Sequence, residues 1–262
     1  MQPICLITGA SAGIGAALAR VFALHGHALV LTARRETPMQ ALADAIADAG
    51  QKRPQVIVAD LGAADGPARL AEALERQGFE PEFVVNNAGY GLLGEAAELD
   101  RTQQRAMIEL NCRTLTDLSL RWLPSIKRHR GGILNVASIA AFLPGPGMAV
   151  YHASKAYVLS FSEALHQELN DDGVRVCTLC PGPVPTEFNA RAGIPVGFFP
   201  GYLSRSAEQV AQEGYTAFMG GHRVVAPGLA NRIFTLLPRL LPRSLMLAAT
   251  GWRWSQAHRH KG

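Results

Sequence analysis

Short apolar runs alternate with longer amphipathic stretches along most of the chain. Apolar residues between the runs recur at helical spacing, as at Ile14, Leu18 and Phe22. The runs, each short enough for a buried parallel strand, fall at residues 4–7, 28–32, 56–59, 83–85, 132–137, 174–180 and 223–227. This alternation predicts an α/β protein with a doubly wound, Rossmann-type, mostly parallel sheet and helices on both faces.

The amphipathic stretches predict helices whose ends carry recognisable signals. Pro124 is expected to bend or interrupt the helix of residues 101–129. Ser206 and Gln209 form a capping-box pattern that predicts the start of another helix. Further helices are expected at residues 39–49, 67–77 and 149–169.

A glycine-rich turn follows the first strand and opens the first helix. Its sequence, Thr8-Gly-Ala-Ser-Ala-Gly-Ile-Gly15, has the spacing Gly-x-x-x-Gly-x-Gly. A strand, such a turn and a helix form the setting of a phosphate-binding loop, because the backbone can approach a pyrophosphate and the helix N-terminus offers free N–H groups. The same residues also fit Gly-x-Ser-x-Gly, the nucleophile elbow of a serine hydrolase with Ser11 as nucleophile. That alternative needs a later acid and histidine at strand ends, and the histidines offer no good candidate.

Tyr151 and Lys155 stand one helical turn apart, and Ser138 follows the strand of residues 132–137. A lysine ammonium on the same helix face favours a phenolate, which predicts that Lys155 lowers the pKa of Tyr151 toward neutral pH. A serine hydroxyl from a strand end could orient a substrate oxygen. These three residues predict proton and hydride chemistry on a carbonyl.

Taken together, these motifs resemble the short-chain dehydrogenase/reductase family, in its compact single-domain branch. The match includes Asp60-Leu61, Asn86-Asn87-Ala88-Gly89 and Pro181-Gly182, and it spans residues 8–186. The resemblance implies that Tyr151 is the general acid/base, that Ser138 orients the reacting oxygen, and that Lys155 holds the nicotinamide ribose. It also implies that Asn111 anchors a water that passes protons to Lys155. The cofactor residues implied by motif and resemblance are Gly9, Ser11, Gly13, Ile14, Gly15, Arg34, Arg35, Asp60, Leu61, Asn87, Ala88, Gly89, Tyr151, Lys155, Pro181, Gly182, Val184 and Thr186.

Arg34 and Arg35 indicate the choice of cofactor. An NAD enzyme usually places an acid after the second strand, where it binds the ribose 2′-hydroxyl. Here Ala33 and Arg34 occupy that place, and a guanidinium suits a 2′-phosphate. We therefore expect NADP(H) as cofactor and no metal.

Composition narrows the class of protein further. Hydrophobic residues make up 48% of 262, which is ample for a core, and strand–helix alternation without a linker favours one domain. Four cysteines are too few for a disulfide framework, and Cys177-x-x-Cys180 is expected in the core because it lies in a strand. The chain reaches its first strand at residue 4, so no signal peptide fits, and we expect a cytoplasmic protein.

The last part of the chain differs from the rest in charge and pattern. Residues 187–221 are rich in apolar groups and are expected to form a lid that favours an apolar substrate. All 21 acids precede residue 214, whereas residues 214–262 carry 7 Lys+Arg. We expect residues 1–228 to form one catalytic domain and residues 229–262 an apolar, basic arm. No recognition motif points to nucleic acid.

That arm could contact either of two partners. It could pack on a partner subunit of a homodimer or homotetramer, or touch an anionic membrane surface weakly. Pro238 and Pro242 are expected to prevent one continuous amphipathic helix, which favours the subunit. A catalytically idle NADP-binding sensor or scaffold on the same fold is the alternative function, although a sensor would not need Ser138, Tyr151 and Lys155 together.

Overall fold

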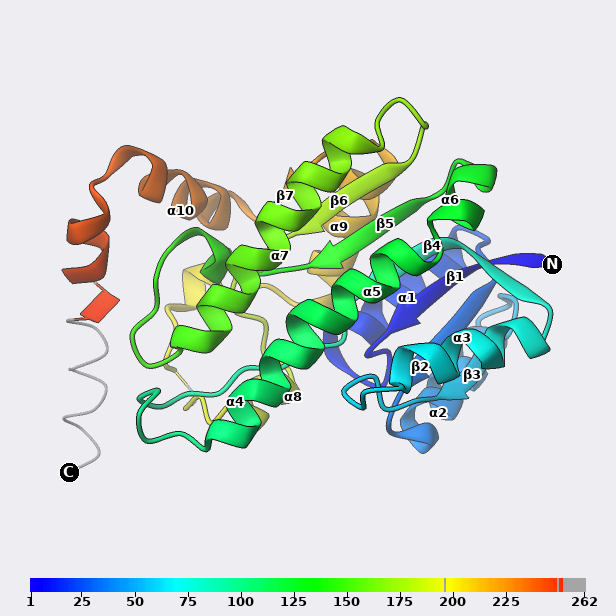
Figure 1. The fold of residues 1–262 in the computed structure, drawn as a ribbon, viewed down its shortest axis with the longest axis horizontal. Coiled ribbons are helices and arrows are strands. Elements are labelled where there is room, and N and C mark those ends of the chain that lie inside the picture. Colours follow the sequence, from blue (N-terminus) through cyan, green and yellow to red (C-terminus); the bar gives the residue numbers. More distant parts are fainter. Residues whose placement is uncertain (196, 249, 252–262) are drawn as a thin grey trace.

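The computed structural model describes residues 1–195, 197–248 and 250–251 (Figure 1). Seven strands form one sheet, and every neighbouring pair is parallel, in the order β3-β2-β1-β4-β5-β6-β7. The strands are β1 Gln2–Thr8, β2 Leu29–Ala33, β3 Gln55–Val58, β4 Phe79–Asn86, β5 Gly132–Val136, β6 Arg175–Leu179 and β7 Val224–Val225. The expected doubly wound α/β fold is confirmed, and the sheet is entirely parallel.

The strand order reverses its direction of growth between β1 and β4. Strands before this point are added toward one edge, and strands after it toward the other. The crevice outside the carboxyl ends of β1 and β4 is where open α/β sheets bind ligands. The glycine-rich turn follows β1, and Asn87 follows β4, so both lie at this switch point.

Helices cover both faces of the sheet (Figure 1). One face packs against α1 Gly13–Leu24, α2 Glu36–Asp48 and α9 Ala207–Met219, around the fully buried Phe22 and Phe218. The other face packs against α3 Gly66–Arg76, α5 Leu115–Arg121, α6 Leu123–His129 and α7 Ala149–Glu168. The remaining helices are α4 Arg101–Ile108, α8 Glu187–Arg191 and α10 Leu229–Leu240.

The single helix expected at residues 101–129 is instead divided. A π-helical turn, Glu109–Thr114, separates α4 from α5, and Trp122 leaves the helical conformation (φ −104°, ψ 13°) before α6. Pro124 lies in the first turn of α6, where its missing N–H costs nothing. The proline interruption was therefore expected correctly, whereas periodicity alone could not show the π turn. The capping box of Ser206 and Gln209 at the start of α9 is confirmed.

The C-terminal arm differs from expectation at one of its two prolines. Helix α10 runs through Pro238, so this proline does not break it, and the chain becomes extended only at Leu241, before Pro242. Cys177 and Cys180 are both buried and free, as a strand in the core requires. Across the part of the chain that is described, no helix has the length and hydropathy to span a bilayer.

Candidate active site

The turns after β1 and β4 are locked together by side-chain and backbone hydrogen bonds. Asn87 Nδ2 donates to the carbonyl oxygens of Thr8 at 2.9 Å and Gly9 at 3.2 Å. Thr8 Oγ1 accepts from the backbone N–H groups of Asn87 and Ala88, both at 3.0 Å. A Cβ on Gly15 would lie 2.4 Å from Asn87 Nδ2, so only glycine allows the two turns to approach this closely.

The N-terminus of α1 is left open toward the switch point. Its N-cap residue is Ala12, which makes no side-chain capping bond, and its first turn carries no acid. The first N–H groups of a helix have no partner within the helix. With the partial positive charge of the helix dipole, they suit a phosphate group. Gly9 (φ 65°) and Gly13 (φ 57°) supply the left-handed turn that leads into this helix.

The two arginines after β2 have different surroundings. Arg35 Nη2 lies 2.9 Å from Glu187 Oε2 of α8 and donates to Ser11 Oγ at 3.2 Å. Arg34 is exposed. Burial raises the pKa of Tyr90, and the positive charge of Arg34 partly opposes this rise. Arg34 therefore lies on the side of Gly89-Tyr90, whereas the charge of Arg35 is already opposed by a carboxylate.

Ser138, Tyr151 and Lys155 meet beyond the carboxyl end of β5. Ser138 caps the 3₁₀ turn Ile139–Phe142, and its hydroxyl accepts from Ala140 N at 3.1 Å. Lys155 Nζ donates to the carbonyl oxygen of Val136 at 2.9 Å and lies 5.8 Å from the centre of the Tyr151 ring. The structure thus brings together the three side chains that the sequence singles out.

Burial decides the pKa values of this group. Desolvation raises the pKa of Tyr151 to about 12, although a hydrogen bond with Ser138 opposes the rise. Desolvation also lowers the pKa of Lys155 to about 8. The expected lowering of the Tyr151 pKa by Lys155 is therefore wrong for the protein chain without a bound cofactor. The cost of burying a phenolate exceeds any stabilisation by the lysine.

Asn111 lies inside the π-helical turn and is almost fully buried. Its Nδ2 donates to Tyr90 O at 3.0 Å and to Ser154 Oγ at 3.1 Å, and its Oδ1 accepts from Tyr90 N at 3.2 Å. A Cβ on Gly89 would lie 2.9 Å from Asn111 Oδ1 and 3.5 Å from Lys155 Nζ. π turns recur at functional sites, and this one carries Asn111 to the neighbourhood of Lys155.

The remaining predicted cofactor residues lie along the same sheet edge. The Asp60 carboxylate accepts from Gly62 N, while Leu61 is buried and its carbonyl accepts from Thr114 Oγ1. Pro181 O accepts from Ile139 N, which ties the loop after β6 to the Ser138 turn. Further along that loop are Val184, which is buried, and Thr186, which caps α8 and touches Gly13. Ile14 is partly buried against the core, and a Cβ on Gly182 would meet Asn231 of α10.

Comparison with known proteins identifies the family. The sequence model of the short chain dehydrogenase family matches residues 3–194. The chain belongs to this family. It is 35% identical over 261 residues to a sulfoacetaldehyde reductase of Chromohalobacter salexigens, covering 97% of each sequence. As a member of the family it is an oxidoreductase that acts on alcohol or carbonyl substrates with a nicotinamide cofactor.

Two solved structures of the same family have closely similar folds. A short-chain dehydrogenase from Sphingobium yanoikuyae in complex with NADPH superimposes with a TM-score of 0.80, at 33% identity, covering 90% of this chain and 92% of that one. A bulky-bulky ketone specific alcohol dehydrogenase from Comamonas testosteroni gives a TM-score of 0.76 at 29% identity, covering 90% of each chain.

An apolar cluster surrounds Tyr151 in this dehydrogenase fold. The rings of Tyr151 and Phe188 lie 5.6 Å apart, and a Cβ on Gly91 would lie 3.1 Å from both side chains. The cluster combines Met107 of α4, Ala140 of the 3₁₀ turn, Met148 just before α7, and Ala192 and Ile194 of the expected lid. Packed against these residues are Tyr90, Leu92, Leu93, Val150, Phe198 and Phe199. Val196, also expected in the lid, lies outside the described residues.

His152, the neighbour of Tyr151 in the sequence, contacts the segment that follows the Ser138 turn. Its Nδ1 lies 2.8 Å from Leu143 O, so it donates there, and a Cβ on Gly145 would lie 2.1 Å from its Nε2. Burial lowers the pKa of His152, and hydrogen bonds with the backbone of Leu143 and Ala140 offset only part of this lowering. His152 thus joins the turn that carries Ser138 to the helix that carries Tyr151. Only its position next to Tyr151 could have suggested this from the sequence.

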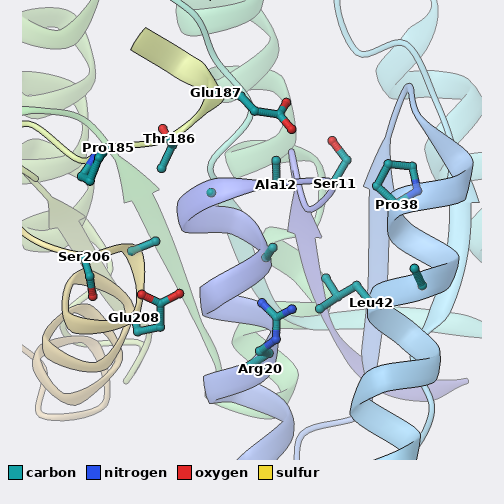
Figure 2. Close-up of a pocket in the computed structure, with 14 residues that line it drawn as sticks. Ser11, Ala12, Arg20, Pro38, Leu42, Pro185, Thr186, Glu187, Ser206 and Glu208 are labelled. Atoms are coloured by element: carbon teal, nitrogen blue, oxygen red, sulfur yellow. The ribbon is translucent and has the colours of Figure 1, made fainter. Parts of the chain in front are cut away.

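A groove lies beside the glycine-rich turn (Figure 2), and Ser138, Tyr151 and Lys155 are not among the residues that line it. Residues of α1, α2, the loop before α8 and the start of α9 line it, including Arg20, Leu42, Glu187 and Glu208. Of the expected cofactor residues it contains only Ser11, Gly13 and Thr186. Ser11 contacts Arg35, and among the hydrogen bonds of the described residues none joins Ser11 to a histidine. The geometry therefore gives no support to the hydrolase alternative.

Proposed function

We propose that this protein is an NADP(H)-dependent oxidoreductase that reduces apolar ketones or aldehydes, or oxidises the corresponding alcohols. The observation that carries the proposal is the meeting of Ser138, Tyr151 and Lys155 at the carboxyl end of β5, next to the switch point, with an apolar cluster around Tyr151. In this proposal residues 1–228 act as one domain, with a lid at about 187–221, and residues 229–262 form an arm.

The chain's own residues fit a dinucleotide phosphate. The uncapped start of α1 supports a pyrophosphate, and the exposed guanidinium of Arg34 supports a 2′-phosphate. The Sphingobium yanoikuyae relative, which binds NADPH, supports the same choice. We assign the contacts along the edge to the remaining expected residues, with Asp60 and Leu61 toward the adenine and Val184 and Thr186 toward the nicotinamide.

Proton transfer is assigned to Tyr151. When bound, the nicotinamide supplies or accepts the hydride. A phenol whose pKa is about 12 stays protonated at neutral pH, so Tyr151 can donate its proton to the oxygen of a carbonyl that is being reduced. Ser138 Oγ orients that oxygen. Lys155, with a pKa of about 8, is still mainly charged at neutral pH and holds the ribose, and Asn111 supports the path by which the proton is replaced.

An apolar substrate is proposed because apolar side chains surround Tyr151. Phe188, Phe198 and Phe199 come from the lid, and Met107 and Met148 from the body of the protein. Burying such surface against a substrate is favourable by about 25 cal/mol per Å². The ketone-specific relative agrees with this, whereas the sulfoacetaldehyde reductase relative argues for a small anionic substrate.

NADPH consumption with a bulky aromatic ketone and with sulfoacetaldehyde tests the proposal. We expect faster turnover of the ketone, and Tyr151→Phe should lose roughly 10²- to 10⁴-fold in kcat while keeping NADPH binding. Turnover of Tyr151→Phe within a few-fold of the parent would contradict the role of Tyr151. A parent that binds NADPH but turns over no carbonyl compound would favour the idle sensor or scaffold.

The cellular location and the oligomeric state of the protein stay predictions. A cytoplasmic location is supported by four free cysteines, which a reducing compartment maintains. A homodimer or homotetramer is checked by the sedimentation mass relative to the 28.1 kDa chain.

A further inference from the structure

Helix α10 has its apolar face turned outward. Leu229, Ile233 and Leu236 follow helical spacing and are 74%, 53% and 51% exposed, and Leu237 beside them is also exposed. The opposite face carries Asn231 and Thr235, which are buried. A surface helix normally buries its apolar stripe and exposes its polar residues. The arrangement of α10 is the reverse, so its apolar stripe has no partner within the described residues.

Specific polar contacts hold α10 in this orientation. Asn231 Nδ2 donates to Leu203 O at 3.1 Å and to Pro227 O at 2.8 Å. Arg232 Nε donates to Ala226 O at 3.3 Å, and its Nη2 lies 3.6 Å from Glu213 of α9. The outward direction of the leucines is therefore fixed by hydrogen bonds from the buried face.

The chain after α10 continues the same apolar surface. Residues 243–248 are helical, with Met246 buried while Leu245 and Leu247 are exposed, as is Leu241 before them. Figure 1 shows α10 leaving the body of the protein and the following segment turning along the same end of the molecule. Half of the large exposed hydrophobic residues of the described chain therefore fall between residues 229 and 247. Such a gathering marks an interaction surface.

Charge indicates what covers this surface. By sequence, residues 229–262 carry 6 Lys+Arg and no acid; Arg232 lies near Glu213 of α9, whereas Arg243 is exposed among the leucines. Two arms packed on each other about a two-fold axis would bring like charges together, without an acid of the arm to offset them. Anionic lipid headgroups supply the missing counter-charge, and acyl chains supply the apolar phase. Because α10 continues through Pro238 and the chain becomes extended only at Leu241, residues 229–240 form one amphipathic helix that can lie along a lipid surface.

We propose that residues 229–247 form an interfacial anchor that lies on an anionic lipid surface. The exposed leucines enter the boundary between headgroups and acyl chains, and Arg243 contacts lipid phosphates.

Flotation of the full chain with vesicles tests the anchor. We expect binding to vesicles of phosphatidylglycerol and phosphatidylcholine in equal parts, none to phosphatidylcholine alone, and release near 1 M salt, where the screening length falls to about 3 Å. Changing both Leu236→Gln and Leu237→Gln should weaken partitioning into the vesicles roughly tenfold for each leucine that is buried in lipid in the parent. Arg243→Gln should weaken it about fivefold.

Matched controls lie elsewhere on the surface. Leu24→Gln and Leu120→Gln change leucines that are exposed outside the arm, and Arg69→Gln removes an exposed charge of α3. We expect all three to float like the parent, and unchanged NADPH binding to show that the arm variants are folded.

Two outcomes would overturn the anchor. One is that the parent protein fails to float with the anionic vesicles, or floats equally well with neutral vesicles. This test needs no variant. The other is a dimer in solution that the paired leucine variant converts to a monomer, since this assigns the face to a second copy of the chain.

Discussion

At the scale of single residues, the site depends on polar groups held away from water. Lys155 is buried with the Val136 carbonyl as acceptor, and burial shifts its pKa and that of Tyr151 in opposite directions. Deeper in the sheet, Asn86 Nδ2 donates to Asn135 Oδ1 at 2.8 Å, and Asn135 Nδ2 donates to Ser162 Oγ at 2.9 Å. Such bonds specify one arrangement of strands and helices, because a buried polar group without a partner is costly.

Lys155→Met should reveal the buried charge as a pH-dependent difference in stability. The pKa of Lys155 falls from 10.5 to about 8 on folding, so between these values the unfolded chain binds more protons. The parent should therefore gain stability relative to the variant as pH rises from 8 to 10.5, by about 3 kcal/mol at about 1.36 kcal/mol per pKa unit. Urea denaturation across this range measures the difference, and a difference that stays constant with pH would contradict the shift.

Arg34→Ala should weaken NADPH binding far more than NADH binding. Only NADPH offers a 2′-phosphate, and a hydrogen bond to a charged group contributes about 1.5 to 3 kcal/mol, which corresponds to a loss of tenfold or more. Titration of both cofactors measures the effect. Arg53→Ala is the control, because Arg53 pairs with Asp44 away from the switch point. A parent that prefers NADH would show that the interpretation of Arg34 is wrong.

At the scale of elements, short irregular turns place the catalytic candidates. The π-helical turn carries Asn111, the 3₁₀ turn after β5 carries Ser138, and the first turn of α7 carries Tyr151. His152 connects the last two of these elements through Leu143 O. The distance between Ser138 and Tyr151 therefore depends on a contact between a turn and a helix, not on either element alone.

His152→Ala should lower kcat by up to about 10²-fold while changing NADPH affinity little, because small displacements of catalytic groups have effects of this size. His152→Gln, which keeps a side-chain donor, should recover part of the loss. Ser206→Ala is the stability control, since loss of this cap costs about 1 kcal/mol far from the reaction. Equal kcat values for His152→Ala and the parent would remove the positioning role.

At the scale of the whole molecule, the parallel sheet gathers segments from distant parts of the chain. The ends of β1, β4, β5 and β6 deliver their loops to one edge. Arg35 and Glu187, which are 152 positions apart in the sequence, join the loop after β2 to α8, the first helix of the proposed lid. Both side chains are exposed in part, so their ion pair contributes roughly 0.2 to 1 kcal/mol and can open readily.

Arg35→Gln should loosen the lid without unfolding the protein. Amide hydrogen exchange in α8 is expected to rise by at most about fivefold, as the loss of one exposed ion pair allows. Arg191→Gln is the matched control, because Arg191 contacts the same carboxylate from within α8. If Arg35→Gln leaves the exchange of α8 unchanged, the link between the loop and the lid has no mechanical role.

Local sequence patterns are enough to predict the fold class, the glycine-rich turn and the identity of the three catalytic candidates. These features are local: an apolar run followed by glycines and a helical period, or Tyr151 one turn before Lys155, can be recognised without knowing what packs around them. The order of the strands is not a local feature, and the structure supplies it.

Properties that depend on neighbours from distant parts of the chain are fixed only in the folded protein. Burial reversed the expected pKa shift of Tyr151, and Glu187 turned Arg35 from a free cation into half of an ion pair. Local pattern could not show which face of α10 packs inward, because the buried hydrogen bonds of Asn231 override the usual preference for burying leucine. Desolvation, pairing and packing are all set by contacts between distant segments, so they exist only once the chain is folded.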